Sequence, residues 1–458
     1  MLLTLTVFAG CNDDDPDPNP NAHVNNWIYD QMDFWYYWHD DLPAKPNKNQ
    51  EPDTFFASLL SGDDRFSWIQ DDFIELLNSL EGVTKEAGYE LILYYESQGS
   101  SNVIAQVLYI KPNSPAEDAG LKRGDVITHI NGQQITDTNY SELLGATSSP
   151  YTIQFEALDI DNETFLPAET RSLTPVEYAE NPNYFRTIID TGDKKIGYYV
   201  YNFFSDGPSG GAASYNAEMD NIFSEFKSAG ITDLILDLRF NRGGSESSAV
   251  NLASQIAPGV SGTTLFAKRE YNEAVTKEIL ADPELGADFL NTYFTSKAEN
   301  IGSQTSGRLY VLTGSSTASA SELVINGLRA YMDVVLIGDV TVGKNVGSIS
   351  LFEENNPDNT WGMQPIVVKI FNSLGQSDYT EGFVPDILDE DNSLYLFPLG
   401  NANEPLLSKA IEQITGTSSM GRKGSRLAAI TRGHTVSSTL LRKPSTLVVD
   451  LPARSPGN

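Results

Sequence analysis

The stretch LYVLTGSSTASASELVINGLRAY, residues 309–331, combines an apolar strand, a turn of small residues and a helix. The run Leu309 to Leu312 is typical of a buried strand, and a helix is predicted over Glu322 to Tyr331. The turn between them would present the hydroxyl of Ser319 at the N-terminus of the helix, where backbone N–H groups and the helix dipole can stabilise an oxyanion. This stretch therefore predicts an α/β fold with a serine placed for acyl transfer.

Lys344, 25 residues after Ser319, is the predicted partner of that serine. A serine nucleophile needs a base, and no histidine lies in a stretch typical of a catalytic loop. The chain has four histidines, His23, His39, His129 and His434. A lysine acts as a base only when it is neutral, so its pKa must fall from about 10.4 to about 7 or 8. Burial among the valines of residues 340–346 would lower the pKa in this way.

Residues 338–344 also fit the phosphate-binding pattern G-x-x-x-x-G-K, and they follow the predicted strand Val334 to Ile337. Asn345, however, stands where a nucleotide-binding loop has the Ser or Thr that ligates magnesium. Residues 347–351 are predicted to form a strand, whereas the motif needs a helix there. The sequence therefore disfavours nucleotide binding.

With these residues the chain resembles the carboxyl-terminal processing, or tail-specific, serine peptidases. The resemblance rests on the run Thr317 to Glu322 and on a Gly-Lys lysine 25 residues after its middle serine. It extends to Leu236 to Gly244, a segment similar to the family's Asp-Leu-Arg-x-Asn-x-Gly-Gly. The resemblance implies that Ser319 is the nucleophile and that Lys344 is the base.

The same resemblance implies an oxyanion hole whose donors are the backbone N–H groups of Gly244, Gly243 and Ala320. Two positions depart from the family pattern. Ser348 stands where many members have a glutamine that orients the lysine, and Ala330 stands where an aspartate is often found. These departures leave open an alternative in which the Ser/Lys dyad is idle and the protein only binds peptides.

Residues 83–175 are predicted to form a domain of short strands. The predicted strands are Tyr89 to Tyr95, Val103 to Ile110, Val126 to Ile130 and Tyr151 to Ala157. The segment Ser114 to Gly132 closely resembles a PDZ domain in the bacterial circular arrangement. The resemblance implies that a peptide adds to the sheet with its carboxylate on the loop Gly88, Tyr89, Glu90 and Leu91. A PDZ domain that serves only as a scaffold is the alternative, because Glu90 would repel a carboxylate unless it points away.

The remaining segments complete a multidomain α/β organisation. The aromatic-rich residues 23–82 are predicted to form a small helical N-terminal domain, similar to that of bacterial members of the same peptidase family. Residues 181–416 alternate strands and helices, which predicts helices packed on a largely parallel sheet, and the resemblance implies a crotonase-like peptidase core. Residues 417–458 hold seven Lys/Arg and one acidic residue, and this basic tail is expected to be disordered.

The N-terminus of the chain suggests where the protein resides. Residues 1–11 are apolar and end in Cys11, the only cysteine, and they resemble a bacterial lipoprotein signal whose cysteine is lipidated. Residues 12–22 are typical of an extended acidic tether. The protein is therefore expected in the cell envelope, attached to the membrane only through a lipid, and either facing the periplasm or exposed at the surface.

The function that these features imply together is hydrolysis by a serine endopeptidase near the C-terminal tails of envelope polypeptides, through an acyl-enzyme and without a cofactor. The net charge of −32 disfavours nucleic acid as a partner. Scattered histidines and the absence of H-E-x-x-H disfavour a catalytic metal. The alternative is a catalytically inactive lipoprotein that binds peptides through its PDZ domain.

Overall fold

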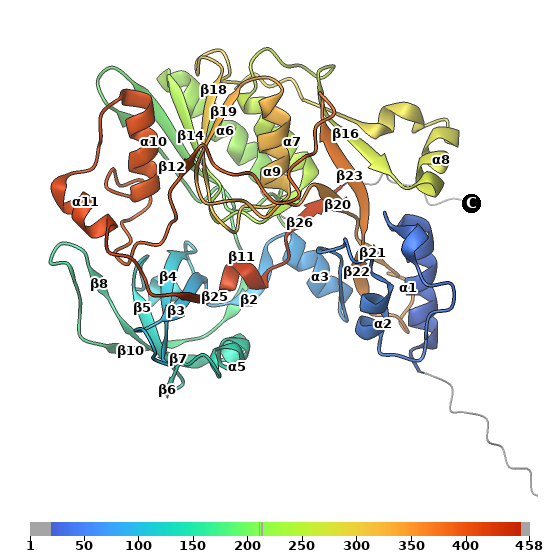
Figure 1. The fold of residues 1–458 in the computed structure, drawn as a ribbon, viewed down its shortest axis with the longest axis horizontal. Helices are drawn as coiled ribbons and strands as arrows, with labels where there is room; N and C mark the ends of the chain where they lie inside the picture. The colour runs from blue at the N-terminus through green and yellow to red at the C-terminus, as the bar shows by residue number, and fades with distance from the viewer. Residues whose placement is uncertain (1–19, 210, 212–213, 450–458) are drawn as a thin grey trace, which may run out of the picture.

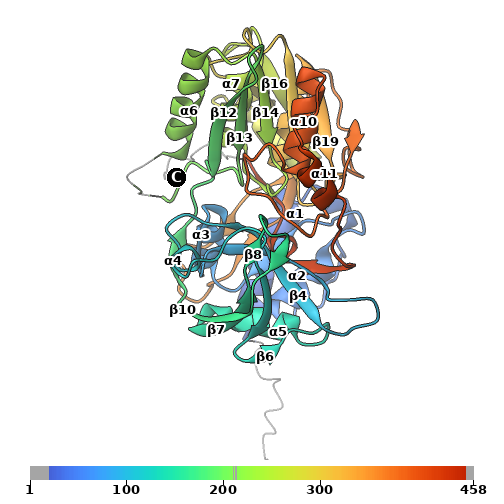
Figure 2. The ribbon, with the colours of Figure 1, turned by 90° about the vertical axis from the view of Figure 1, so that its left-hand side faces the viewer.

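The computed structural model describes residues 20–209, 211 and 214–449. The predicted signal with Cys11, and most of the predicted tether, lie outside the described residues. The described chain forms an α/β core, with an N-terminal helical region and a PDZ-like β region side by side beneath it (Figure 1). The view from the side shows the PDZ-like strands below the helices of the core (Figure 2).

A six-stranded sheet forms the centre of the core, with the order β12-β13-β14-β18-β19-β24. Its strands span Phe185–Asp190, Lys195–Val200, Asp233–Asp237, Arg308–Thr313, Asp333–Gly338 and Ile387–Leu388. The strands from β13 to β24 are parallel, and β12 runs antiparallel to β13. The prediction of a largely parallel sheet is thus confirmed.

A second six-stranded sheet has the order β15-β26-β20-β23-β16-β17. Its strands span Gly243–Ser245, Thr446–Val448, Val346–Ser348, Ile366–Asn372, Leu265–Tyr271 and Asn291–Tyr293. Helices α6 (Tyr215–Ala229), α7 (Glu246–Ile256) and α9 (Ala320–Arg329) share one buried apolar cluster with both sheets. Helix α10 (Pro405–Thr415) packs on the opposite face of the first sheet, because side chains alternate between the two faces of each strand.

The PDZ-like region follows the sequence prediction closely. Its strands β3, β4, β5, β7 and β10 span Tyr89–Tyr95, Val103–Ile110, Val126–Ile130, Tyr151–Glu156 and Glu169–Leu173. The first three have the predicted bounds, and β7 ends one residue earlier than predicted. The turns between these strands use residues with positive φ, namely Gly124, Asn131 and Gly132. Because such turn residues can be recognised in the sequence, the bounds of the strands between them could be predicted.

The smaller elements complete the two lower regions. Those of the PDZ-like region are β2 (Val83–Glu86), α4 (Pro115–Asp118), β6 (Gln133–Gln134), α5 (Tyr140–Gly145), β8 (Leu158–Asp159), β9 (Thr164–Phe165) and β11 (Val176–Ala179). The N-terminal region contains α1 (Ala22–Trp35), α2 (Pro52–Leu59), β1 (Trp68–Gln70) and α3 (Phe73–Leu80), which agrees with the predicted helical domain. Strand β1 pairs with β22 (Gly362–Gln364), which pairs with β21 (Leu351–Phe352) and so ties this region to the core.

The structure corrects the prediction of a disordered tail. Residues 417–449 form ordered elements, whereas residues 450–458 lie outside the described residues. The elements are α11 (Arg422–Ala428), β25 (Thr435–Ser438), α12 (Thr439–Arg442) and β26 (Thr446–Val448). Strand β25 extends the PDZ-like sheet, and β26 enters the core with Leu447 and Val449 buried. Pairing with distant strands therefore supplies an order that the local composition does not predict.

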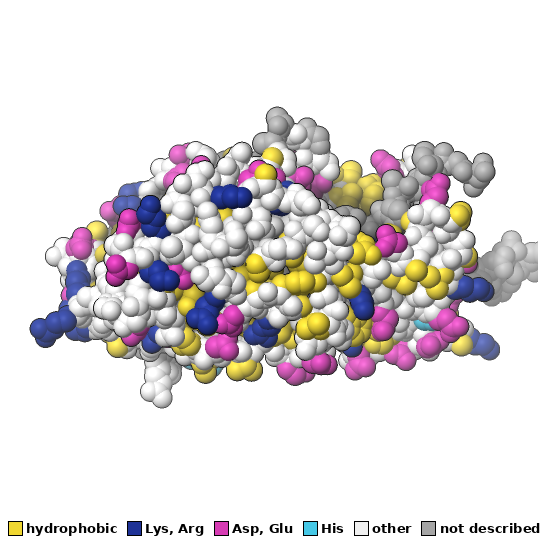
Figure 3. All heavy atoms as spheres, turned by 90° about the horizontal axis from the view of Figure 1, so that it is seen from above, with side chains coloured by type: hydrophobic (Ala, Val, Ile, Leu, Met, Phe, Trp, Pro, Cys, Tyr) yellow, Lys and Arg dark blue, Asp and Glu magenta, His cyan; other side chains and the backbone are white. Residues whose placement is uncertain are grey.

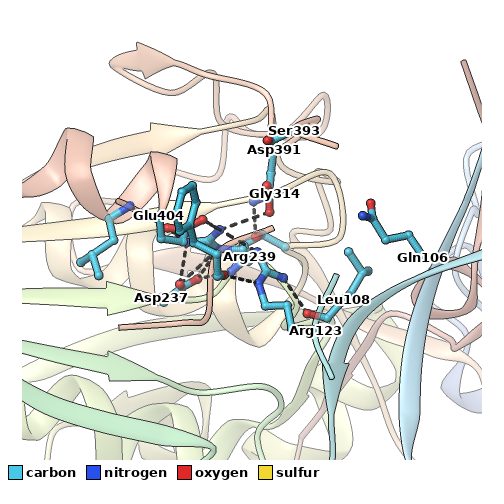
Figure 4. A network of polar contacts seen from close by, with 12 residues as sticks. Gln106, Leu108, Arg123, Asp237, Arg239, Gly314, Asp391, Ser393 and Glu404 are labelled. Atoms are coloured by element: carbon cyan, nitrogen blue, oxygen red, sulfur yellow. Dashed lines mark hydrogen bonds and ion pairs between the residues drawn. The ribbon is translucent and has the colours of Figure 1, made fainter. Parts of the chain in front are cut away.

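A buried network of charges joins the PDZ-like region to the core (Figure 4). Arg239, which follows β14, pairs with Asp237 at 2.9 Å, Glu404 at 2.6 Å and Asp391 at 3.2 Å. From the PDZ-like region, Arg123 lies 3.8 Å from the same Glu404. Breaking such a network would leave buried charges uncompensated, so it holds the two regions in one orientation.

The upper surface of the core carries acidic and basic side chains around a band of hydrophobic ones (Figure 3). Several large hydrophobic residues of the described chain are exposed at the surface, among them Leu374, Val384 and Leu388. None of the helices in residues 20–209, 211 and 214–449 combines the length and apolar character needed to cross a membrane.

Candidate active site

Ser319 is the N-cap residue of α9 and lies just beyond the end of β18, as the sequence predicts. Its φ of 61° and ψ of −111° are unusual for a residue with a side chain, and such strain persists only where surrounding contacts fix it. Ser319 is fully buried, and its Oγ has no hydrogen-bond partner among the described residues. The hydroxyl faces the first turn of α9 in a capping box with Glu322, without a hydrogen bond of normal geometry.

The carboxylate of Glu322 joins the serine to the lysine loop. It accepts hydrogen bonds from the backbone N–H groups of Ser319 (2.7 Å), Gly343 (2.7 Å) and Lys344 (2.8 Å) and from the hydroxyl of Thr341 (2.6 Å). Burial raises the pKa of Glu322, while these hydrogen bonds act in the opposite direction. The sequence analysis missed this role, although a glutamate three residues after an N-cap serine is the capping-box spacing.

Lys344 lies in the loop between β19 and β20 and is 1% exposed. Its Nζ donates to the carbonyl of Ser445 at 2.6 Å and lies 5.2 Å from the ring centre of Phe66. Burial lowers the pKa of Lys344 to about 7; Asp64 acts against this shift, and Arg242 adds to it. The amine is thus substantially neutral near pH 7, which is the state that a general base requires.

Gly243 lies against Ser319 and Ala320. A Cβ on Gly243 would be 2.8 Å from the Ser319 Cβ and 3.0 Å from the Ala320 nitrogen, so a side chain would not fit. A Cβ on Gly244 would be 2.1 Å from a backbone carbonyl oxygen, and both glycines have positive φ, 103° and 136°. The N–H of Gly243 donates to Asn241 at 2.9 Å. Of the three predicted oxyanion donors, Gly243 and Ala320 thus lie beside Ser319, and the N–H of Gly243 is already engaged by Asn241.

The predicted carboxylate-binding loop, residues 88–91, lies at the start of β3 in the PDZ-like sheet, whereas Ser319 lies in the core. The N–H of Leu91 donates to the hydroxyl of Thr439 at 2.8 Å. Glu90 is buried and contacts two lysines, one of them Lys443 of the tail. Burial alone would raise the pKa of Glu90, but the two lysines lower it to about 2. The glutamate is thus a paired structural anion.

A cavity of 130 Å³ lies beside the two glycines. Apolar and aromatic side chains from all three regions of the fold line it, among them Leu80, Tyr109, Phe203 and Phe240. Residues of the tail, including Thr446, form part of its wall. The sequence analysis did not connect the tail to this site; its only local signal was the apolar run that begins at Leu447. In residues 20–209, 211 and 214–449, no group of three His, Cys, Asp or Glu side chains could hold a metal ion.

Comparison with known protein families matches three parts of the chain. The model for peptidase family S41 matches residues 195–388, and that for the peptidase S41 N-terminal domain matches residues 23–68. Together these two matches span more than half of the chain. The chain belongs to peptidase family S41. The S41 region contains Ser319, Lys344 and both glycines, and a PDZ domain model matches residues 106–153 of this peptidase.

Curated relatives of this S41 peptidase carry names that refer to carboxyl-terminal processing. It is 24% identical over 318 residues to carboxyl-terminal-processing peptidase 1, chloroplastic, of Arabidopsis thaliana, covering 68% of this chain and 58% of the relative. It is 24% identical over 327 residues to the carboxyl-terminal-processing protease of Synechocystis, covering 70% and 67%. The chain spans about half to two thirds of the length of the curated relatives it matches.

The fold of this S41 peptidase is also found in a solved structure. The crystal structure of a Bacteroides fragilis protein assigned to the S41 proteases superposes with a TM-score of 0.68 at 29% sequence identity. The match covers 85% of this chain and 97% of that chain. The arrangement of helical, PDZ and peptidase regions is therefore the arrangement of a known S41 fold.

Proposed function

We propose that this S41 peptidase is a serine endopeptidase of the carboxyl-terminal processing type, with Ser319 as the nucleophile and Lys344 as the general base. The observation that carries the proposal is the burial of the Lys344 amine in a loop that Glu322 joins to Ser319, and this burial lowers the pKa of Lys344 to about 7. Glu322 holds the backbones of both residues through one carboxylate. A base with a pKa near the working pH and a buried, unengaged hydroxyl are the two components that acyl transfer requires.

The proposed reaction uses groups of this chain alone. Lys344 accepts the proton of Ser319 Oγ as the oxygen forms a bond to the carbonyl carbon of the substrate. The N–H groups of Gly244 and Ala320 stabilise the resulting oxyanion. Lys344 then gives the proton to the leaving amine as the peptide bond breaks, which leaves an acyl-enzyme on Ser319. A water molecule, deprotonated by Lys344, hydrolyses the ester and restores the hydroxyl.

The substrate in this proposal is the C-terminal tail of a polypeptide, bound in extended form. PDZ domains take such tails by adding them as a strand to a sheet edge, and the candidate here is the side of β3 on which β25 now pairs. We also propose that the substrates are envelope proteins and that lipidation of Cys11 anchors the peptidase in the envelope. This part rests on the N-terminal sequence alone.

The test is incubation of the purified protein with an unfolded polypeptide that has an apolar C-terminus, with products identified by mass spectrometry. Wild type is compared with Ser319→Ala and Lys344→Ala. We expect cleavage by wild type and by neither variant, with peptide affinity retained in Ser319→Ala. Cleavage by all three proteins would contradict the assignment of the dyad.

A second candidate function is peptide binding without hydrolysis. The observation in its favour is that Lys344 Nζ donates to the Ser445 carbonyl, while Ser319 Oγ has no partner among the described residues. In the same experiment this function predicts that all three proteins bind the polypeptide and that none cleaves it.

A further inference from the structure

The C-terminal segment, residues 435–449, lies along the edge of the PDZ-like sheet. Strand β25 pairs antiparallel with β3, with Ser438 opposite Ile92 and Ser437 opposite Leu93. Figure 1 shows this strand, in red, beside the cyan strands of the PDZ-like region. Strand addition to a sheet edge is how PDZ domains bind peptides. The edge that a substrate tail would use is therefore occupied by the chain itself.

The same segment then enters the candidate active site. Strand β26 pairs parallel with β15, with Thr446 opposite Gly243, and the N–H of Thr446 donates to the carbonyl of Arg242 at 3.1 Å. Parallel pairing in this register sets the N–H of Gly244 opposite the carbonyl of Thr446. That carbonyl oxygen, the Ser319 Cβ and the Ala320 nitrogen all lie within 3.0 Å of the point where a Gly243 Cβ would stand. A peptide carbonyl of the tail thus lies beside Gly243, Ser319 and Ala320.

Charged side chains of the site are engaged by the segment as well. Lys344 Nζ donates to the Ser445 carbonyl at 2.6 Å. Arg242 donates through Nε to the Lys443 carbonyl at 2.8 Å and through Nη2 to the Ser445 hydroxyl at 2.7 Å. Lys443 Nζ forms an ion pair with Glu90, a buried residue of β3. The tail thus contacts three parts of the molecule at the same time: Lys344, which is the proposed base, strand β15 of the core, and strand β3 of the PDZ-like sheet.

We propose that residues 435–449 are an autoinhibitory segment, and that an extended polypeptide must displace this segment to reach Ser319. The proposal rests on the proposed function for the consequence of displacement, because release frees Lys344 to accept the Ser319 proton. The pairing of the tail with β3 and with β15 is independent of the proposed function. Residues 435–449 and the substrate compete for the same backbone hydrogen bonds of β3 and β15. A polypeptide that displaces the segment must therefore bind as an extended strand, and a folded protein surface cannot replace it.

Two changes to the full chain test the segment: one weakens its pairing with the core, and the other fixes it to the PDZ-like sheet. Thr446→Pro removes the N–H that bonds to the Arg242 carbonyl and keeps the buried Leu447 and Val449. Thr446→Val is the matched control, because it keeps the N–H and the branched shape. A disulfide between Ile92→Cys and Ser438→Cys, in a Cys11→Ser background, fixes β25 on β3. These residues are directly opposite, so a short cross-link spans them.

Two readouts are measured for each protein: cleavage of the unfolded polypeptide, and binding of a fluorescent extended peptide with an apolar C-terminus, followed by anisotropy. We expect Thr446→Pro to raise both the cleavage rate and the peptide affinity about 2- to 10-fold, the factor that one lost backbone hydrogen bond gives. The oxidised disulfide variant should lose cleavage and peptide binding, and reductant should restore both. The single cysteine variants should not respond to reductant.

The outcomes separate this proposal from the proposed function. If no protein cleaves but the disulfide blocks peptide binding reversibly, the segment is inhibitory and the peptidase proposal fails. If every protein cleaves and binds alike, with or without reductant, the peptidase proposal stands and the inhibitory segment is refuted. A folded Thr446→Pro that loses activity would show that the segment completes the site, which also refutes inhibition. Should Thr446→Pro not fold, the disulfide variant decides alone.

Discussion

Two lysines of this peptidase, Lys111 and Lys344, are equally buried, with 1% of each exposed, but their surroundings are opposite. Lys111 lies 2.5 Å from Glu86, 2.6 Å from Glu180 and 3.4 Å from Glu90. Burial alone would lower its pKa, but these carboxylates raise it well above the usual value. Lys344 has no carboxylate within ion-pairing distance among the described residues, and burial lowers its pKa to about 7. The number of adjacent acids, and not burial, decides whether a buried lysine is a structural cation or a base.

Glu322 shows how a nearby acid is kept from converting Lys344, the proposed base, into a structural cation. Its two oxygens receive three backbone N–H groups and the Thr341 hydroxyl, and none of these bonds goes to the Lys344 amine. The carboxylate therefore fixes the position of the lysine backbone and adds only a modest attraction for the proton on Nζ. The predictions below test this contrast between the two lysines.

The largest effect is expected from Lys344→Met, which replaces the amine by an apolar side chain of similar length. Loss of a general base should lower kcat by about 10²- to 10⁴-fold. The variant should be at least as stable as wild type near pH 7, because it removes a desolvated amine. Steady-state kinetics and thermal unfolding measure the two effects. Full activity in the variant would remove Lys344 from the mechanism.

Lys111→Met should have the reverse profile. It would leave the buried Glu90 and Glu180 and the half-buried Glu86 around an apolar side chain, which costs about 3 to 5 kcal/mol in the free energy of unfolding. Urea unfolding monitored by fluorescence measures this loss. Activity per folded molecule should change much less than in Lys344→Met at low temperature, since Lys111 lines the cavity but its ion pairs are with glutamates and not with Ser319 or Lys344. A loss of less than 1 kcal/mol would show that the cluster is not held by its cation.

The pH dependence should separate the two lysines by sign. The pKa of Lys344 in the folded protein, about 7, is below its ordinary value of 10.5, so the unfolded chain binds more protons between these values. The contribution of Lys344 to stability therefore rises as the pH increases through this window. The pKa of Lys111 is raised, so its contribution is complete below about 10.5 and is lost at higher pH.

Urea unfolding of wild type and of each Met variant across this range measures the two contributions. The kcat/KM of wild type should rise with pH and level off above about 7, as Lys344 loses its proton. A rate that falls with pH through 7 would contradict a neutral lysine as the base.

The smallest effect is expected from Ser348→Ala. The resemblance to tail-specific peptidases predicts a glutamine here that orients the lysine, but Ser348 Oγ donates to Gln364 at 2.8 Å and to the Leu447 carbonyl at 3.4 Å, and not to Lys344. The change should cost about 0.5 to 1.5 kcal/mol of stability and leave the midpoint of the pH–rate profile in place. A shifted midpoint would show that Ser348 does act on the lysine.

Sequence patterns located the elements that turn residues and hydrophobic periodicity define locally. Strands β3, β4 and β5 have their predicted bounds, and Ser319 lies at the predicted helix N-terminus. Ordering of the tail could not be predicted, because Thr446 pairs with Gly243, about 200 positions earlier in the chain. The spacing of Ser319 and Glu322 is that of a capping box, so this part of the role of Glu322 could be predicted. Its bonds to residues 341–344 could not, because they depend on the tertiary position of the loop between β19 and β20. The sequence predicted that burial would lower the pKa of Lys344. It could not predict that Asp64, Arg242 and Ser445 surround the amine, because these residues are distant in the chain.

The carboxylate of Glu322 also has a consequence for how the site opens. Three amide protons, those of Ser319, Gly343 and Lys344, share this one acceptor, although they belong to a helix terminus and to a separate loop. Exchange of any of them with solvent deuterium requires that the carboxylate be released or that both segments move. The three amides should therefore share one free energy of opening, as a single opening unit, and Glu322→Ala should make their protection independent.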